Sequence, residues 1–277
     1  MTENNTEQTI ETSTENSTES STENTTARVA LVTGGNRGLG RSEALHLARA
    51  GADVVLTYRG NEAEALDVVR RIEEEGRRAA ALQLDVTAPE TFDAFVATLR
   101  TTLADAFGTD GLDILVNNAG TAGWTPLGET DVAEVRRLLD THVTGPVMLT
   151  QALAPLLRDG GRVVNTSTGL ARFTGVDGYS VYAAAKGAVE VWTRYLAKTL
   201  APRRITVNAV APGATGTDFG GGSMRDDETV RGHLSGLIAM GRVGEPDDIG
   251  ATVAALASPA MGWVTGQRVE ASGGMNL

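Results

Sequence analysis

Short apolar runs alternate with longer amphipathic stretches along the chain from residue 28 onward. The apolar runs predict strands, and the 3.6-residue periodicity predicts helices. The strands fall at 28–33, 53–58, 79–84, 113–117, 161–166, 205–210 and 268–271, and the helices at 38–50, 61–75, 89–107, 131–158, 181–201 and 246–257. Several strands are continuous apolar runs, which is typical of burial on both faces of a parallel sheet. The pattern therefore predicts an α/β fold, a single Rossmann-type doubly wound parallel sheet flanked by helices.

Residues 1–27 have a different composition, dominated by Thr, Ser, Asn and Glu. Glutamates recur at every fourth position from Glu3 to Glu23, so a helix would place like charges along one face. The segment also lacks the basic and apolar regions of a secretion signal. We therefore expect a disordered acidic tail at 1–27 and one catalytic domain at 28–277.

Composition excludes several classes of function. The chain has 277 residues, no Cys, a net charge of −11 and 3 scattered His residues, so thiol chemistry is excluded and no metal site is expected. The negative charge disfavours a nucleic-acid partner, and no apolar run reaches the length of a membrane span. These features predict a cytoplasmic protein that acts on a small molecule.

A glycine-rich turn links the first predicted strand to the first helix, in Thr33-Gly-Gly-Asn-Arg-Gly-Leu-Gly40. Glycines at 34, 38 and 40 allow a tight turn and a close approach of a ligand to the backbone. The helix N-terminus that follows offers free N–H groups and a partial positive charge to a pyrophosphate. This arrangement favours a nucleotide site.

Four motifs in register resemble the short-chain dehydrogenase/reductase family over 28–277. They are Thr33-Gly34-x-x-x-Gly38-x-Gly40, Asn117-Asn-Ala-Gly120, Tyr182-x-x-x-Lys186 and Pro212-Gly213. The resemblance implies a nicotinamide cofactor and a set of cofactor-binding residues. They are Gly34, Asn36, Arg37, Gly38, Leu39, Gly40, Tyr58, Arg59, Asp85, Val86, Asn118, Ala119, Gly120, Tyr182, Lys186, Pro212, Gly213, Thr215 and Thr217.

The end of the second strand bears on which cofactor binds. An acidic residue there would bind the ribose hydroxyls of NAD(H), but the chain has Thr57-Tyr58-Arg59. Arg59, helped by Arg37 in the glycine-rich turn, can pair with a 2′-phosphate. The sequence therefore favours NADP(H) over NAD(H).

Tyr182 and Lys186 lie four residues apart, on one face of a helix. The resemblance implies that Tyr182 protonates a carbonyl oxygen and that Lys186 holds the nicotinamide ribose. Two nearby cations, the lysine and the oxidised ring, would lower the pKa of the phenol by about 3 units. The family usually has a serine where this chain has Thr168, which keeps the hydroxyl, and Ser167 is the rival donor.

The resemblance also places His142 where the family usually has asparagine, in a bent helix whose backbone carbonyl holds a water. The imidazole could itself exchange protons, or could simply pack. Phe219–Met240 is predicted to form a mobile lid, over an apolar pocket made by Trp124, Leu170, Phe173, Val176, Phe219 and Met224. Family members usually assemble as tetramers, so a homotetramer or a homodimer is expected.

These features predict an NADPH-dependent carbonyl reductase, or an alcohol dehydrogenase in the reverse direction. A 3-ketoacyl-thioester reductase is a narrower alternative. A catalytically weakened NADP-binding sensor or scaffold is an alternative of another class, suggested by His142 and Thr168.

Overall fold

A computed structural model describes residues 1–2, 27–175 and 177–277. Seven strands form one sheet in the order β3-β2-β1-β4-β5-β6-β7, and every neighbouring pair is parallel. The strands are β1 (Val29–Val32), β2 (Asp53–Tyr58), β3 (Ala79–Gln83), β4 (Leu112–Asn117), β5 (Leu157–Thr166), β6 (Thr206–Pro212) and β7 (Arg268–Ala271). The predicted doubly wound parallel sheet is confirmed.

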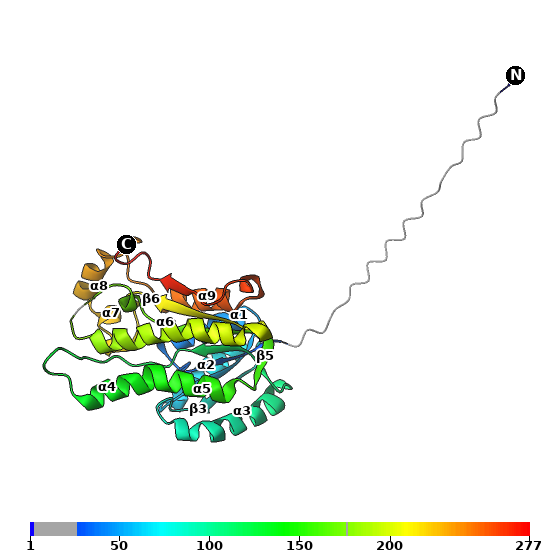
Figure 1. The fold of residues 1–277 in the computed structure, drawn as a ribbon, viewed down its shortest axis with the longest axis horizontal. Coiled ribbons are helices and arrows are strands. Elements are labelled where there is room, and N and C mark those ends of the chain that lie inside the picture. The colour runs from blue at the N-terminus through cyan, green and yellow to red at the C-terminus, as the bar shows by residue number, and fades with distance from the viewer. Residues whose placement is uncertain (3–26, 176) are drawn as a thin grey trace.

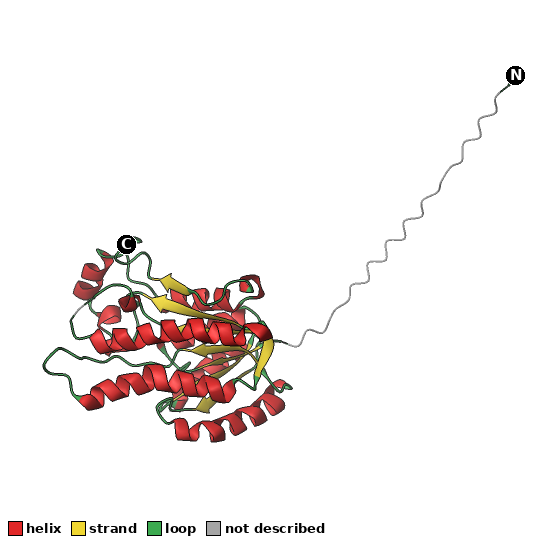
Figure 2. Cartoon of the chain, in the orientation of Figure 1, coloured by secondary structure: helices red, strands yellow, loops and turns green. Residues whose placement is uncertain are grey.

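Helices cover both faces of this sheet, so the strands lie between two helical layers (Figures 1 and 2). One face packs against α1 (Gly38–Arg49), α2 (Glu62–Glu74) and α9 (Pro246–Ala257), and the other against α3 (Phe92–Phe107), α5 (Gly145–Leu153) and α6 (Ser180–Leu200). Every residue of β1, β2 and β6 is buried. The continuous apolar runs thus correspond to strands enclosed on both sides.

The helical pattern predicted over 131–158 is confirmed as far as Leu153, where the chain forms α4 (Val132–Leu139), a π-helical turn at Asp140–Thr144, and α5. Gly145 follows the turn, and a Cβ there would come within 2.3 Å of the Val86 carbonyl oxygen. The bend therefore brings this helix close to the end of β3. The following strand, predicted from 161, begins at Leu157 and continues through an irregularity in its pairing with β4.

The predicted lid segment at 219–240 contains two helices, α7 (Ser223–Asp226) and α8 (Glu228–Ser235). Asp227 caps α8 by accepting hydrogen bonds from the backbone N–H groups of Thr229 and Val230. This Asp-Glu start is a sequence signal for a helix N-terminus. Both helices lie at the end of the molecule near the C-terminus (Figure 1).

The tail predicted at 1–27 falls almost wholly outside the described residues and stays a prediction. Within the ranges that the structure covers, no helix is long and apolar enough to cross a membrane.

Candidate active site

A cleft of about 1150 Å³ opens where the carboxyl ends of the central strands meet. The glycine-rich turn lines one part of it and α6 lines another. It gathers nearly all the predicted site residues, from Gly34, Asn36, Arg37, Gly38, Leu39, Gly40, Arg59, Asp85 and Val86 to Asn118, Ala119, Gly120, His142, Thr168, Tyr182, Lys186, Pro212, Gly213, Thr215 and Thr217. This is the edge where open α/β sheets bind ligands.

Tyr58 was predicted to bind the cofactor, but it is not among the residues described as lining the cleft. Its side chain is buried in the core formed with α1 and α2. Arg59, one residue beyond the strand, lies in the cleft instead. The prediction for Tyr58 is therefore not supported by its placement, because side chains alternate between the two faces of a strand.

The glycine-rich turn approaches its neighbours too closely for side chains. A Cβ at Gly40 would lie 2.3 Å from the Gly34 carbonyl oxygen and 2.4 Å from the Asn118 amide nitrogen. Thr33 and Asn118 brace the turn, because the Thr33 hydroxyl accepts the backbone N–H of Asn118 at 3.0 Å and the Asn118 amide donates to the Thr33 carbonyl at 2.9 Å. These hydrogen bonds hold the turn rigidly at the N-terminus of α1.

The start of α1 is suited to an anionic ligand. Arg37 occupies the N-cap position without a side-chain cap bond, and the first turn contains no acidic residue. The N–H groups therefore face the cleft unneutralised, as a pyrophosphate site requires. The residues present fit a dinucleotide, with Arg37 and Arg59 exposed beside the turn.

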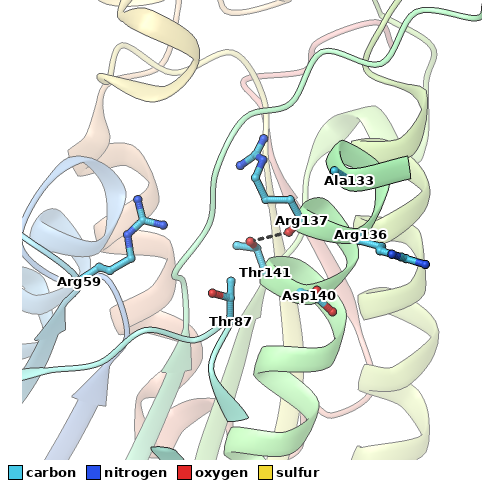
Figure 3. Close-up of a pocket in the computed structure, with 7 residues that line it drawn as sticks. All are labelled: Arg59, Thr87, Ala133, Arg136, Arg137, Asp140 and Thr141. Carbon is cyan, nitrogen blue, oxygen red and sulfur yellow. Dashed lines mark hydrogen bonds between the residues drawn. The ribbon is translucent and has the colours of Figure 1, made fainter. Parts of the chain in front are cut away.

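A smaller hollow of about 370 Å³ adjoins the cleft at Arg59. Figure 3 shows Arg59 on one side and Arg137 of α4 on the other, with Thr87 and Thr141 between them, whereas the Arg136 side chain points away. Arg137 is already paired with Glu134 at 2.6 Å. Arg59 is therefore the arginine of this hollow that also faces the cleft.

Tyr182 and Lys186 project from α6 into the other end of the cleft, and both are buried. Burial raises the pKa of the Tyr182 phenol, and a hydrogen bond with the Thr168 side chain opposes that rise. The Lys186 ammonium donates to the Thr166 carbonyl at 2.6 Å. Lys186 was expected to lower the phenol pKa, but desolvation, which raises it, is the largest effect on this enclosed side chain.

Thr168 and Ser167 have different surroundings. The Thr168 hydroxyl accepts the Leu170 N–H at 3.3 Å and lies close enough to the Tyr182 phenol to lower its pKa. The Ser167 hydroxyl instead donates to the Glu190 carboxylate at 2.6 Å. The geometry favours Thr168 as the hydroxyl next to the phenol.

Arg268 of β7 contacts the segment that carries Ser167 and Thr168. Its guanidinium donates to Glu190 at 2.7 Å and to the Thr168 carbonyl at 3.2 Å. Sequence reasoning missed Glu190 and Arg268, because the contact joins residues distant along the chain.

His142 lies in the π-helical turn, fully buried, with its ring edge-on to Tyr182 at a centroid distance of 5.2 Å. Its Nε2–H donates to the Thr121 carbonyl at 2.8 Å, and among the described residues Nδ1 has no partner. Burial, with the charge of Lys186, lowers the pKa of His142 to about 3. The imidazole is therefore neutral near pH 7, which argues against the idea that it exchanges protons there.

Aromatic side chains surround the α6 end of the cleft. Tyr182 lies 5.7 Å from Phe219 and 6.2 Å from Tyr179, measured between ring centroids. Leu170, Phe173, Phe219 and Met224 line the cleft as predicted, whereas Trp124 is exposed and packs edge-on against Tyr179. Val176 lies outside the described residues. Sequence reasoning missed Met275 and Asn276, which also line the cleft.

Comparisons with known proteins identify the family of the chain. A family model described as Enoyl-(Acyl carrier protein) reductase matches residues 34–276. The hydroxynaphthalene reductase-like protein Arp2 of Metarhizium brunneum is 38% identical over 259 residues, which cover 89% of this chain and 94% of that protein. The chain belongs to the short-chain dehydrogenase/reductase family of oxidoreductases.

Two solved structures are similar over almost the whole domain. The promiscuous reductase LugOII, which catalyses keto-reduction at C1 during lugdunomycin biosynthesis, has a TM-score of 0.86 and 37% identity, covering 91% of this chain and 99% of that one. The angucycline C-6 ketoreductase LanV with bound NADP has a TM-score of 0.84 and 36% identity, covering 90% and 95%.

Proposed function

We propose that this protein is an NADPH-dependent carbonyl reductase, which reduces a ketone to a secondary alcohol and catalyses the reverse oxidation when alcohol is in excess. One observation carries the proposal. The Tyr182 phenol, the Thr168 hydroxyl and the Lys186 ammonium meet at one end of a cleft whose other end is the braced glycine-rich turn.

The chain's own residues supply the proton chemistry. The Tyr182 phenol is protonated at neutral pH because burial raises its pKa, so it can donate to the oxygen of a bound ketone. The Thr168 hydroxyl, next to the phenol, donates a second hydrogen bond to that oxygen. Lys186, anchored on the Thr166 carbonyl, favours the phenolate left after proton transfer. NADPH, when bound, supplies the hydride.

Three observations support NADPH over NADH. Arg59 lies at the cleft end of β2, where an acidic residue would select NADH. Arg37 stands exposed at the start of α1, within the same turn. The similar ketoreductase LanV was solved with NADP.

The cleft favours a ketone on a fused aromatic scaffold. The rings of Tyr179, Tyr182 and Phe219 offer flat surfaces against which a planar substrate can stack. The relatives support this class, since one is named for hydroxynaphthalene reduction and another for an angucycline. The α7–α8 segment lines the mouth of the cleft with Met224 and Leu234, and we propose that it acts as a lid.

The test is NADPH oxidation at 340 nm against bicyclic aromatic ketones, aliphatic ketones and 3-ketoacyl thioesters. Tyr182→Phe should lower kcat by about 10²- to 10⁴-fold, because it removes the proton donor. Tyr179→Phe is the matched control and should retain most activity, since position 183 is Ala and no lysine partners Tyr179.

Each outcome of this panel decides something. If the protein prefers a 3-ketoacyl thioester, that narrower alternative would replace the aromatic ketone as the proposed substrate class. NADPH binding without turnover of any carbonyl would favour the sensor reading and contradict the proposal.

Assembly and location remain predictions. The expected tetramer would use α6, α9 and β7, and the exposed side chains of Val191 and Tyr195 on α6 support such an interface. A cytoplasmic location stays an expectation from the sequence.

A further inference from the structure

The C-terminal segment of the chain forms part of the cleft wall. Met275 is buried in a small apolar cluster with Ile238, against which Phe173 and Met224 also pack. Met275 and Asn276 both line the cleft. Asn276 has a φ of 52°, a left-handed conformation that asparagine adopts more readily than most residues. This end of the chain therefore has a defined path beside the place where a substrate would bind.

Backbone hydrogen bonds join this segment to the residues that follow α8. The Asn276 N–H donates to the Leu237 carbonyl at 3.0 Å, and the Met240 N–H donates to the Gly273 carbonyl at 3.0 Å. Leu237 itself lines the cleft. Figure 1 shows the C-terminus close to α8. The C-terminal segment and the end of the α7–α8 segment therefore form one continuous part of the wall.

Arg172 holds the same segment by its carbonyl groups. Its guanidinium donates to the Met275 carbonyl at 2.8 Å and to the Asn276 carbonyl at 3.4 Å. Two of its nitrogens also donate to the two carboxylate oxygens of Glu270 in β7, at 2.5 and 2.7 Å. This forked contact fixes the plane of the guanidinium, and lysine cannot reproduce it because an ammonium group is a single point charge.

Glu270 is in turn fixed by further donors. Arg268 and the Ser272 hydroxyl each donate to it at 2.8 Å. The hydrogen bond from Arg172 is the largest cause that lowers the pKa of Glu270 to about 2, so the pair is charged near neutral pH. Because Arg268 also donates to the Thr168 carbonyl, a continuous chain of charge-assisted hydrogen bonds runs from Thr168 to the C-terminal segment.

Arg172 also contacts a second part of the wall. Its guanidinium carbon lies 5.1 Å from the centroid of the Phe173 ring. Phe173 lines the cleft, and a Cβ at Gly169 would come within 2.9 Å of its ring. These contacts do not involve Tyr182 or Lys186. Arg172 therefore bears on the shape of the wall rather than on proton transfer.

We propose that Arg172, held in place by Glu270, is a positioning residue that sets substrate specificity, because it fixes Phe173 and the Met275–Asn276 segment as one wall of the substrate pocket. Arg172 is not among the residues described as lining the cleft, so it acts through the residues that it contacts. The effect on substrate choice rests on the proposed function, whereas the anchoring of the C-terminal segment is a property of the folded chain.

The size of the cleft determines which substrates depend on this wall. A small aliphatic ketone held at the Tyr182 phenol fills little of a cleft of about 1150 Å³. A fused-ring ketone extends further from the phenol, so the remaining walls decide its orientation. Loosening one wall should therefore affect the larger ketone more.

Hydrogen–deuterium exchange tests the anchoring without any substrate. Arg172→Gln keeps a long side chain but loses both the charge and the fork. We expect the backbone amides of 237–240 and 273–277 to exchange about tenfold faster in this variant, as for the loss of one charge-assisted hydrogen bond. Arg172→Lys keeps the charge without the fork and should give a smaller increase. Mass spectrometry of peptides that cover the two ranges measures the rates.

Arg203→Gln is the matched control. The Arg203 side chain is 36% exposed against 38% for Arg172, and it likewise bonds an acid, Asp159, and two carbonyl groups, those of Ala154 and Leu157. These contacts lie at the start of β5, away from the carboxyl ends of the strands, and Arg203 is not among the described lining residues of the cleft. Exchange in the C-terminal segment should be unchanged.

The reductase assay separates specificity from general damage. In Arg172→Gln, the KM for a bicyclic aromatic ketone should rise about 3- to 10-fold, because binding must then order a loose wall. The KM for a small aliphatic ketone and the kcat for both ketones should stay within about twofold, since the lost contacts affect binding rather than chemistry. Arg172→Lys should recover part of the loss.

Unchanged exchange of the C-terminal segment in Arg172→Gln would overturn the proposal. Equal increases of KM for both ketones, or a fall of kcat for both, would also overturn it, because Arg172 would then be a general structural group. If the unaltered protein reduces no carbonyl, the proposed function fails, yet the exchange experiment still decides whether Arg172 holds this wall.

Discussion

The two ends of the cleft are built on different physical principles. At the glycine-rich turn, the ligand would meet backbone N–H groups and two exposed arginines, Arg37 and Arg59. At the α6 end, Tyr182, Lys186 and His142 are all buried, and burial is the largest cause of each pKa shift. The first end depends on backbone shape and the second on desolvation. Exposed charges are screened by water, whereas enclosed groups feel their neighbours strongly.

After the loss of the Tyr182 phenol, the largest expected effect tests the buried end. Thr168→Val removes the hydroxyl next to Tyr182 while keeping the branched shape, and it should lower kcat by about 10- to 1,000-fold, as for a lost oxyanion donor. The measurement is single-turnover reduction with saturating NADPH. Ser167→Ala is the control, because that hydroxyl bonds Glu190, and a larger loss there would transfer the role to Ser167.

The next effect tests the exposed end. Arg59→Asp should raise the KM for NADPH by about 10- to 100-fold and leave that for NADH nearly unchanged, because the lost contact is to the 2′-phosphate. Steady-state kinetics with both cofactors measures it. Arg100→Asp makes the same charge change on an exposed side chain of α3 that is not among the described lining residues of the hollow or the cleft, and should alter neither KM. Equal effects of Arg59→Asp on both cofactors would contradict the assignment.

The smallest effect concerns stability. His142 has a pKa of about 3 in the folded chain against about 6.5 when unfolded, so the folded state binds fewer protons between these values. The stability due to the neutral imidazole is complete above pH 6.5 and is lost as the pH falls toward 3.

His142→Asn removes this titration. Relative to the variant, the unaltered protein should lose about 2 kcal/mol of unfolding free energy between pH 7 and pH 5. Urea unfolding at both pH values measures it. His233→Asn, at an exposed histidine, should keep the pH dependence of the unaltered protein. If His142→Asn loses the same unfolding free energy between pH 7 and pH 5 as the unaltered protein, the imidazole is not desolvated in the folded state.

The sequence was sufficient to predict the end of the cleft that is formed by the backbone of the glycine-rich turn. Gly34, Gly38 and Gly40 predict a tight turn because only glycine allows so close an approach, and the strand–turn–helix order places them at the carboxyl edge of the sheet. Tyr58 is the exception there, since one residue of register decides whether a side chain enters the cleft or the core.

The sequence was less informative about the buried end. The protonation of His142 depends on what encloses it, and no local pattern records the contact between Glu190 and Arg268. The helices α7 and α8 were not predicted because glycines at 220, 221 and 222 are typical of irregular structure, although Asp227 marks the start of a helix.

The bracing of the glycine-rich turn bears on the entropy of cofactor capture. Thr33 and Asn118 already fix the turn through side-chain bonds to β4 and to each other, and Thr57 holds the Gly34 N–H at 3.1 Å. A preorganised loop loses little conformational freedom when a ligand arrives. Any entropy cost of ordering that calorimetry of cofactor binding detects should therefore arise elsewhere in the molecule. Weakening the hydrogen bonds that hold this turn would reduce the cofactor affinity through entropy, even though no ligand contact is removed.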